Sequence, residues 1–409
     1  MLSAIRPLSS LLLAIFMLMA GAGFMGTLLG LRMEDAGHGA PMIGLLATAY
    51  FSGLALGSRQ VSRVIHRVAH IRAFAAFVAL LSASTLAYSL HQSLPLWIGL
   101  RFIDGLCVAG VYVCLESWLN DQAEPHVRGL ALAAYMIALY GGQGLGQFLL
   151  PLSTITPSTP LVAASILISL SIIPIVLTRN KSPSLQPTPP LPMRKLYGIS
   201  PLGMVGAGAT GVILGAFYGV GAVYTHRLGL TLPSTAAFMS TVIVGGVALQ
   251  WPLGWLSDHF DRRRVIVGTL IGAVLATIGM AIVAAAGPVL LVLGALFGGF
   301  SFALYPLCVA HANDHVSAEQ RVAASGGLIL VYSLGAAAGP LLGALALKQF
   351  GPAGLPGFIA ACAGVAVIFA LWRMAVREPV PSDRQQSYQL LPRTTPMSAM
   401  LDPLTPDEA

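Results

Sequence analysis

Twelve long apolar runs separate the polar segments of this 409-residue chain. A helix needs roughly 18 to 25 apolar residues to cross about 30 Å of hydrocarbon. Unpaired backbone polar groups in hydrocarbon cost several kcal/mol each, so helices are the only open-ended structure that spans a bilayer. We therefore expect an all-α membrane protein with twelve transmembrane helices. The runs lie at about 8–31, 41–60, 72–91, 95–119, 129–151, 160–178, 199–224, 234–257, 264–285, 288–312, 321–347 and 354–376.

The placement of charge agrees with a membrane location. Only 9% of the residues are charged and 56% are hydrophobic, whereas about a quarter of a soluble domain is charged. The net charge of +7 raises the question of a nucleic-acid partner. If residue 1 starts inside, however, 18 of the 22 Lys and Arg lie on the inner side, Arg101 is embedded, and only Arg32, Arg227 and Lys348 lie outside. The positive-inside rule thus predicts two cytoplasmic termini, a cell (inner) membrane location and no nucleic-acid partner.

A repeated cationic segment divides the chain into two halves. Residues 254–264 read GWLSDHFDRRR between two apolar runs, and GSRQVSRVIHR at 57–67 stands 197 positions earlier. Further along, Tyr305 and Asp314 fall 193 positions after Tyr112 and Asp121. Such nearly constant offsets indicate a duplication. Two parallel six-helix repeats are the architecture of one large transporter class, in which the substrate site lies between the repeats.

The polar stretches set the expected domain boundaries. Residues 1–178 and 199–376 form the two six-helix bundles, and a Pro-rich cytoplasmic linker at 179–198 should run extended between them. The tail at 377–409 is rich in Pro and poor in large apolar residues, so we expect it to be disordered and assign it no function. The first run is too long for the core of a cleaved signal peptide and should remain in the protein.

Charged residues in the fourth run are the main site candidates. Arg101 costs at least about 2.5 to 3.5 kcal/mol to insert, and Asp104 lies within reach on the same helix. Together with Tyr112 and Glu116 these residues fall within an arc of roughly 120° at about 100° per residue. This face either lines a cavity that binds substrate and couples protons, or holds an internal ion pair. Glu116 is the rival proton site, and it could instead pair with a loop arginine.

Other polar residues in the apolar runs support two interpretations each. Gln143, Gln147, Gln250 and His311 could contact substrate or hydrogen-bond neighbouring helices. Tyr112 and Tyr305 occupy matching positions in the two halves and could face a cavity. The sequence has no Walker motif, no HExxH and no CxxC set, so we expect no cofactor, no metal site and no enzymatic activity.

Several of the sequence segments resemble those of a known family, the major facilitator superfamily. GWLSDHFDRRR looks like its signature loop, and RFIDG at 101–105 is similar to its fourth-helix motif. YFSGLALGS, ESWLN, LAAYM and QWPLGWLSD look most like the YcaD-like branch, with the likeness running from about residue 8 to 376. The resemblance implies the major facilitator fold and secondary active transport by a rocker-switch motion.

The resemblance also implies a set of gating residues in the two signature segments. Val61 stands where the second copy has Asp258, so the resemblance implies an inner lock in one half only. Alternatively, the first-half arginines anchor the segment to anionic lipid headgroups. The candidates are Gly57, Arg59, Arg63, Arg67, Gly254, Asp258, Arg262, Arg263 and Arg264.

The predicted function is proton-coupled efflux of a small organic solute by alternating access, in a monomer within the lipid bilayer. A sugar or metabolite importer of the same superfamily is the alternative within transport. A membrane receptor or scaffold that moves no solute is the alternative of a different class.

Overall fold

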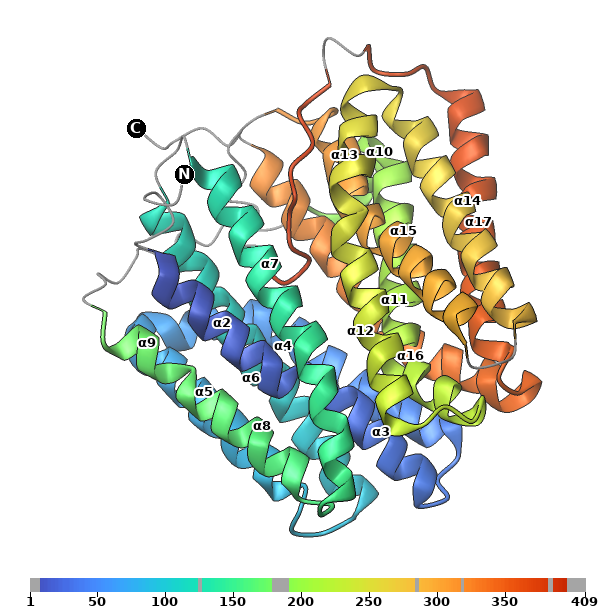
Figure 1. The fold of residues 1–409 in the computed structure, drawn as a ribbon. Helices are drawn as coiled ribbons and strands as arrows, with labels where there is room; N and C mark the ends of the chain where they lie inside the picture. The colour runs from blue at the N-terminus through green and yellow to red at the C-terminus, as the bar shows by residue number, and fades with distance from the viewer. Residues whose placement is uncertain are drawn as a thin grey trace.

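The protein is described here by a computed structural model, which covers residues 8–123, 127–178, 191–283, 287–317, 320–381 and 385–395. Helices dominate both halves of this described chain (Figure 1). The first half contains α2 Ser9–Ala22, α3 Met25–Asp35, α4 Ala40–Val68, α5 His70–Ala87, α6 Leu94–Gln122, α7 Arg128–Gly146, η3 Gln147–Thr154, α8 Thr159–Leu170 and α9 Ile172–Val176. The second half contains α10 Met193–Ile199, α11 Pro201–Arg227, α12 Leu232–Ala248, α13 Gln250–His259, α14 Arg262–Ile282, α15 Pro288–Asn313, α16 Arg321–Phe350 and α17 Gly354–Val376.

Eleven helical segments among the described residues are long and apolar enough to cross a membrane. Three of them are built from consecutive helices: α2 with α3, α8 with α9, and α12 with α13. The expected fifth span falls on α7 and the 3-10 helix η3 that continues it, and this segment is not among the eleven. An all-helical, multi-span protein is therefore confirmed, whereas the number of twelve spans is not.

Prolines and side-chain caps place the helix starts. Proline occupies one of the first two positions of α4, α6, α8, α11, α12 and α15, where its missing N–H costs no helical hydrogen bond. Asp261 begins α14 by accepting the backbone N–H of Arg263 at 3.0 Å. Residues 179–190 of the expected linker lie outside the described residues. The rest of the linker contains α10, a helix where we expected extended chain.

The cationic segment of the first half is helical rather than a loop. We expected a loop at 57–67, but α4 continues unbroken to Val68, and the chain turns at Ala69, whose φ is +69°. In the second half the corresponding break falls at Phe260 and Asp261, and Asp261 caps the next helix. Val64 stands at the position equivalent to Asp261 and cannot cap a helix, so the helix has no local reason to stop.

Glycines bring several helix pairs into backbone contact. A side chain at Gly53 of α4 would meet the carbonyl oxygen of Phe102, and one at Gly105 of α6 would meet that of Tyr50. In the second half a side chain at Gly339 of α16 would likewise meet a carbonyl oxygen of α11. Small residues permit such close approach in membranes. The contact between α4 and α6 fixes which face of α6 turns toward the centre of the protein.

The two halves contact each other directly at one end. We call the end with residues 57–68 and 254–264 the loop end, and the opposite end the far end. At the far end Arg227 Nε donates to Glu34 Oε1 at 2.7 Å, and Thr48 Oγ1 donates to the Ala337 carbonyl at 2.8 Å. Gly44 of α4 faces α16 closely enough that a Cβ there would lie 2.7 Å from the Pro340 oxygen. These contacts close the interface at the far end.

At the loop end a piece of the C-terminal chain lies between the halves. Residues 385–395 run as an extended segment between α7 of the first half and the helices of the second half (Figure 1). We call these residues the tail segment. Its Leu391 is 5% exposed, and Thr395 is fully buried. This part of 377–409 differs from the disordered tail that we expected, while residues 396–409 lie outside the described residues.

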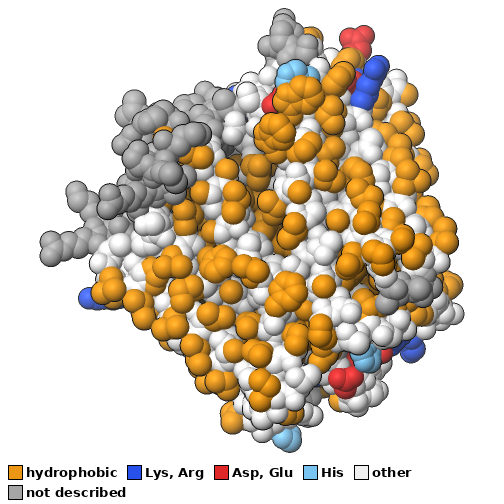
Figure 2. Space-filling model, viewed as in Figure 1, with side chains coloured by type: hydrophobic (Ala, Val, Ile, Leu, Met, Phe, Trp, Pro, Cys, Tyr) orange, Lys and Arg blue, Asp and Glu red, His pale blue; other side chains and the backbone are white. Residues whose placement is uncertain are grey.

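The outer surface suits a hydrocarbon environment. Figure 2 shows a face covered by hydrophobic and uncharged side chains, with its few charged groups toward the ends of the helices. Large apolar side chains are exposed in mid-helix, including Leu275 (63%) and Ile368 (70%). In water such a surface would be an aggregation hazard, whereas lipid accommodates it. The surface therefore agrees with a multi-pass membrane protein.

Candidate functional site

A cavity of about 120 Å³ lies between the two halves. It is aromatic and polar, and both halves and the tail segment contribute to it. Its lining includes Met19, Gly26, Tyr50, Arg101, Tyr112, Tyr140 and Gln143 from the first half, Tyr218 and Tyr332 from the second, and Arg393 and Thr394 from the tail segment. An interface cavity of this kind is where a two-repeat transporter holds its solute.

Arg101 lines the cavity, but Asp104 turns away from it. The guanidinium of Arg101 lies 4.3 Å from the centre of the Tyr50 ring, and its Nη1 is 3.6 Å from Asp104 Oδ2. Asp104 points toward α5, where Ser84 Oγ donates to it at 2.5 Å and the Tyr88 hydroxyl at 2.6 Å. The Asp104 carboxylate thus has one ionic and two hydroxyl partners and is buried. The predicted pair is therefore present, but only its arginine faces the cavity.

Glu116 is buried beneath the tail segment. It is fully buried on α6, and its carboxylate accepts hydrogen bonds from the hydroxyls of Thr394 and Thr395. The Tyr135 hydroxyl donates to the same carboxylate at 3.3 Å. One turn away Tyr112 lines the cavity, and its hydroxyl contacts Met19 Sδ at 3.3 Å. All three donors to Glu116 are neutral groups, two of which belong to a segment held only by non-covalent contacts.

The remaining polar candidates divide between the cavity and helix packing. Gln143 lines the cavity. Gln147 accepts from Thr27 at 2.9 Å and donates to the Gly23 carbonyl at 3.2 Å, so it joins η3 to the first span. Tyr305 is 1% exposed and packs edge-on against Tyr332, with ring centres 5.3 Å apart.

Two further polar residues also lie outside the cavity lining. Gln250, the first residue of α13, donates to the Gly246 carbonyl of α12 at 2.9 Å. His311 lies near the loop end, beside His315, with ring centres 4.9 Å apart. The Gln250 bond stays within the span formed by α12 and α13.

The signature segment of the second half forms a compact charged cluster. Arg262 is 1% exposed and pairs with Asp314 at 2.7 Å and with Asp258 at 3.3 Å. Burial raises the pKa of Asp314 to about 6, although Arg262 opposes this shift. Burial alone would also raise the pKa of Asp261, but hydrogen bonds from Arg263 hold it below its usual value. Arg264, the last arginine of the segment, is exposed.

This charged cluster binds the backbone of the tail segment. The Gln386 N–H donates to Asp314 at 2.8 Å, the Tyr388 N–H donates to Asp258 at 2.7 Å, and Arg262 donates to the Gln386 carbonyl at 2.5 Å. The ring of Tyr388 occupies the place that a side chain would need at Gly254. The second signature segment thus holds the tail segment in register.

Among the described residues, the first-half segment does not form an equivalent cluster. Val61 and Ile65 stand where Asp258 and Arg262 lie in the second half, and both are almost fully buried. Gly57 packs against α6, where a Cβ would lie 2.7 Å from that of Ala109. The arginines of this segment, Arg59, Arg63 and Arg67, are exposed at the loop end.

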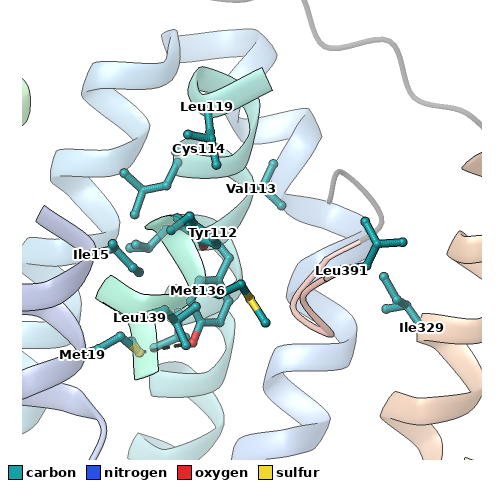
Figure 3. Packing of buried hydrophobic residues seen from close by; sticks show 14 of the residues in the cluster. Ile15, Met19, Tyr112, Val113, Cys114, Leu119, Met136, Leu139, Ile329 and Leu391 are labelled. Carbon is teal, nitrogen blue, oxygen red and sulfur yellow. Dashed lines mark hydrogen bonds between the residues drawn. The ribbon is translucent and has the colours of Figure 1, made fainter. Parts of the chain in front are cut away.

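The tail segment ends in the cavity with Arg393. The guanidinium of Arg393 lies 4.1 Å from the centre of the Phe302 ring and 5.5 Å from that of Tyr140. Leu391 faces Ile329 of α16 across the interface (Figure 3). Sequence reasoning missed Tyr50, Tyr140, Phe302 and Arg393. The three rings lie in apolar runs, where nothing distinguishes them from lipid-facing or packed aromatics.

Two pseudo-repeated helical halves around a central cavity define the class of an integral membrane transporter. Two overlapping regions, residues 11–287 and 204–401, match the profile of the Major Facilitator Superfamily. The chain belongs to this superfamily and is a non-enzymatic transmembrane transporter. It is 29% identical over 349 residues to the uncharacterized MFS-type transporter YcaD of Salmonella enteritidis PT4 (strain P125109), covering 84% of this chain and 90% of that relative. An uncharacterized MFS-type transporter of Yersinia pestis (strain Pestoides F) is 28% identical over 385 residues, covering 93% and 97%.

Solved transporters share the fold. The nucleoside transporter NupG superposes with a TM-score of 0.74 at 14% identity, covering 90% of this chain and 98% of that one. A bacterial homolog of the human lysosomal transporter Spinster, in an inward-facing and occupied conformation, gives 0.71 at 16% identity, covering 93% and 98%. At such identities the likeness establishes the fold alone.

Proposed function

We propose that this protein exports a small organic solute by alternating access, driven by protons, with both termini and the loop end in the cytoplasm. One observation carries the proposal: the halves contact each other directly at the far end, whereas the tail segment fills the interface at the loop end. A rocking motion that exchanges these two contacts would open the cavity to either side in turn. The charge bias of the polar segments supports the orientation, and the superfamily fold supports twelve spans.

Glu116 is the proposed proton carrier. Asp104 is held by Arg101 on its own helix and by the hydroxyls of Ser84 and Tyr88, and none of these partners belongs to the tail segment. The described donors to Glu116 are hydroxyls, two of them on the tail segment. Its environment therefore changes whenever that segment or the interface moves. Ionisable groups within membrane spans often mark proton relays or substrate pathways.

Export rather than import is favoured by the character of the cavity. Arg101 is paired with Asp104, and apart from Arg393 of the tail segment the remaining lining combines five tyrosines with apolar side chains and a few neutral polar ones. A cavity of this kind accepts varied amphiphilic solutes more readily than sugars, which require many fixed hydrogen-bond partners. The protein would work as a monomer, since one chain contains both halves of the cavity.

Spin-label distances test the alternation without knowledge of the solute. One label pair, at Met42 and Leu345, reports on the far end, and a second, at Asp121 and His259, reports on the loop end; all four residues are exposed. The native cysteines would be replaced by serine in this background. We expect two distances for each pair, with the far end opening as the loop end closes, and populations that shift with pH.

Two substitutions locate the proton site. Glu116→Gln should abolish the pH-dependent shift of populations, whereas Asp104→Asn should retain it. A single distance for both pairs at every pH would refute transport and favour the receptor or scaffold. A pH-dependent shift that survives in Glu116→Gln would refute the coupling role of Glu116.

A further inference from the structure

We infer that the cavity binds a monovalent organic cation, whose charged group takes the place that the Arg393 guanidinium occupies in this structure. The inference rests on the proposed transport function and adds the chemical class of the solute. The tail segment then acts as a tethered competitor, because it presents the protein's own cation to the site. Three observations carry the inference: the rings around Arg393, the charge of the cavity, and the way the tail segment is held.

Aromatic rings surround the Arg393 guanidinium on several sides. It lies over the Phe302 ring at 4.1 Å and the Tyr140 ring at 5.5 Å, one from each half of the protein. Tyr218 and Tyr332 line the same cavity as the guanidinium. Cations are attracted to ring faces within about 6 Å, and aromatic cages recognise quaternary and guanidinium ions in this way. The site therefore has the construction of a cation receptor.

The charge of the cavity also favours a cation. Arg101 is paired with Asp104 and lies over Tyr50, so this pair contributes no net charge. Glu116 remains, with neutral hydroxyl donors. Once Arg393 leaves, Arg101 is the one cation left in the described lining, and the rings of Tyr140 and Phe302 border the vacated place. Glu116 lies behind this place, beneath Thr394 and Thr395. Ring faces attract a cation and repel an anion.

The tail segment can leave without unfolding a helix. Backbone hydrogen bonds to Asp314, Asp258 and Arg262 and the buried Leu391 hold it in place, and it has no helical structure of its own. Its departure exposes Phe302 and Tyr140 and removes two hydroxyl donors from Glu116. A cationic solute with adjoining hydrogen-bond donors would restore what Arg393, Thr394 and Thr395 supply. Solute and tail segment thus compete for one site.

Binding of a matched pair of probes tests this inference. Phenylguanidinium is a cation, and phenylurea is a neutral molecule of nearly the same shape. Titration calorimetry would measure both with the full-length wild type and with Arg393→Ala. Because a tethered ligand competes at millimolar effective concentration, we expect Arg393→Ala to bind phenylguanidinium at least about tenfold more tightly than the wild type. In the same variant phenylurea should bind at least about tenfold more weakly than phenylguanidinium.

Variants of the site then separate recognition from stability. In the Arg393→Ala background, Phe302→Leu and Glu116→Gln should each weaken phenylguanidinium binding about fivefold to tenfold and leave phenylurea binding within about twofold. A loss of fold would weaken both probes equally, so the ratio of the two affinities isolates the recognition of charge. Arg72→Ala, an exposed arginine on α5, is the matched control and should bind both probes as the wild type does.

Equal affinities of the two probes in Arg393→Ala, or no gain over the wild type, would overturn the inference. Tighter binding of benzoate than of phenylguanidinium would overturn it as well. None of these results would touch the proposed function, because the spin-label distances need no ligand. Conversely, if those distances do not alternate while the cation preference holds, transport fails and the cation site stands as that of a receptor.

Discussion

Replacing Asp104 with alanine removes the acceptor shared by Arg101, Ser84 and Tyr88. Breaking a buried ion pair from one side costs about 3–5 kcal/mol, since it leaves an uncompensated buried charge. Two hydroxyl donors also lose a charged acceptor, at about 1–3 kcal/mol each if they stay unpaired. Two features of the site reduce the total: Arg101 borders the cavity and remains over the Tyr50 ring. We therefore expect Asp104→Ala to lower the free energy of unfolding by about 4 kcal/mol.

A double-mutant cycle isolates the contribution of the ion pair. Asp104→Asn keeps an oxygen for Ser84 and Tyr88 and should cost about 2 kcal/mol. The double variant Arg101→Met with Asp104→Asn leaves neither charge, so it should cost less than the sum of the two single changes by at least about 1 kcal/mol. Unfolding in mixed micelles of increasing SDS content, followed by circular dichroism, measures the free energy of unfolding of both single variants and of the double variant. Additive costs within about 0.5 kcal/mol would show that the two charges do not stabilise each other.

Three further predictions concern packing, gating and pH. Gly105→Val should prevent stable expression, because its Cβ would overlap a carbonyl oxygen of α4. Gly99→Ala lies on the same helix with open space around it, so its yield of folded protein in size-exclusion chromatography should equal that of the wild type. Glu34→Gln should weaken the partly exposed ion pair with Arg227 by about 1 kcal/mol or less. The population of molecules that are open at the far end should therefore rise by up to about fivefold, as measured by the spin-label distances. Because the pKa of Asp314 is raised to about 6, the native state keeps this carboxyl protonated up to about that pH. Its contribution to the free energy of unfolding is therefore fully present below about pH 4 and is lost as the pH rises to about 6. Unfolding titrations should show a loss of about 2–3 kcal/mol over that range in the wild type relative to Asp314→Asn, and equal slopes would refute the assignment.

Much of the fold follows from sequence patterns, because the bilayer imposes them. Spans must be apolar and helical, and the repeat offset pairs the two halves. The extension of α4 to Val68 could not be foreseen, since the polar composition of residues 57–67 suggests a loop, and only the absence of a capping residue at Val64 argues otherwise. The hydropathy pattern also gives no warning of the 3-10 end of the fifth span.

The candidate site could be predicted only in part. The spacing of Arg101 and Asp104 predicts a pair, but the rotation of α6 that points one inward and the other toward α5 is set by backbone contacts at Gly53 and Gly105. The place of the tail segment depends on backbone hydrogen bonds and one cation over aromatic rings. These interactions have no periodic pattern along the chain. A Pro-rich tail with few large apolar residues therefore suggests disorder even where part of it is bound.

The difference between Asp258 with Arg262 and their first-half counterparts, Val61 and Ile65, has an evolutionary consequence. In the second half these charged groups bind the backbone of the tail segment, whereas the first half has two apolar side chains at the same positions. A peptide extension at the amino terminus would meet no such charged groups in the described part of the first half. An extension at the carboxyl terminus would lie next to Asp258 and Arg262. This asymmetry means that a sequence added at the carboxyl-terminal end can bind the second half through its backbone alone.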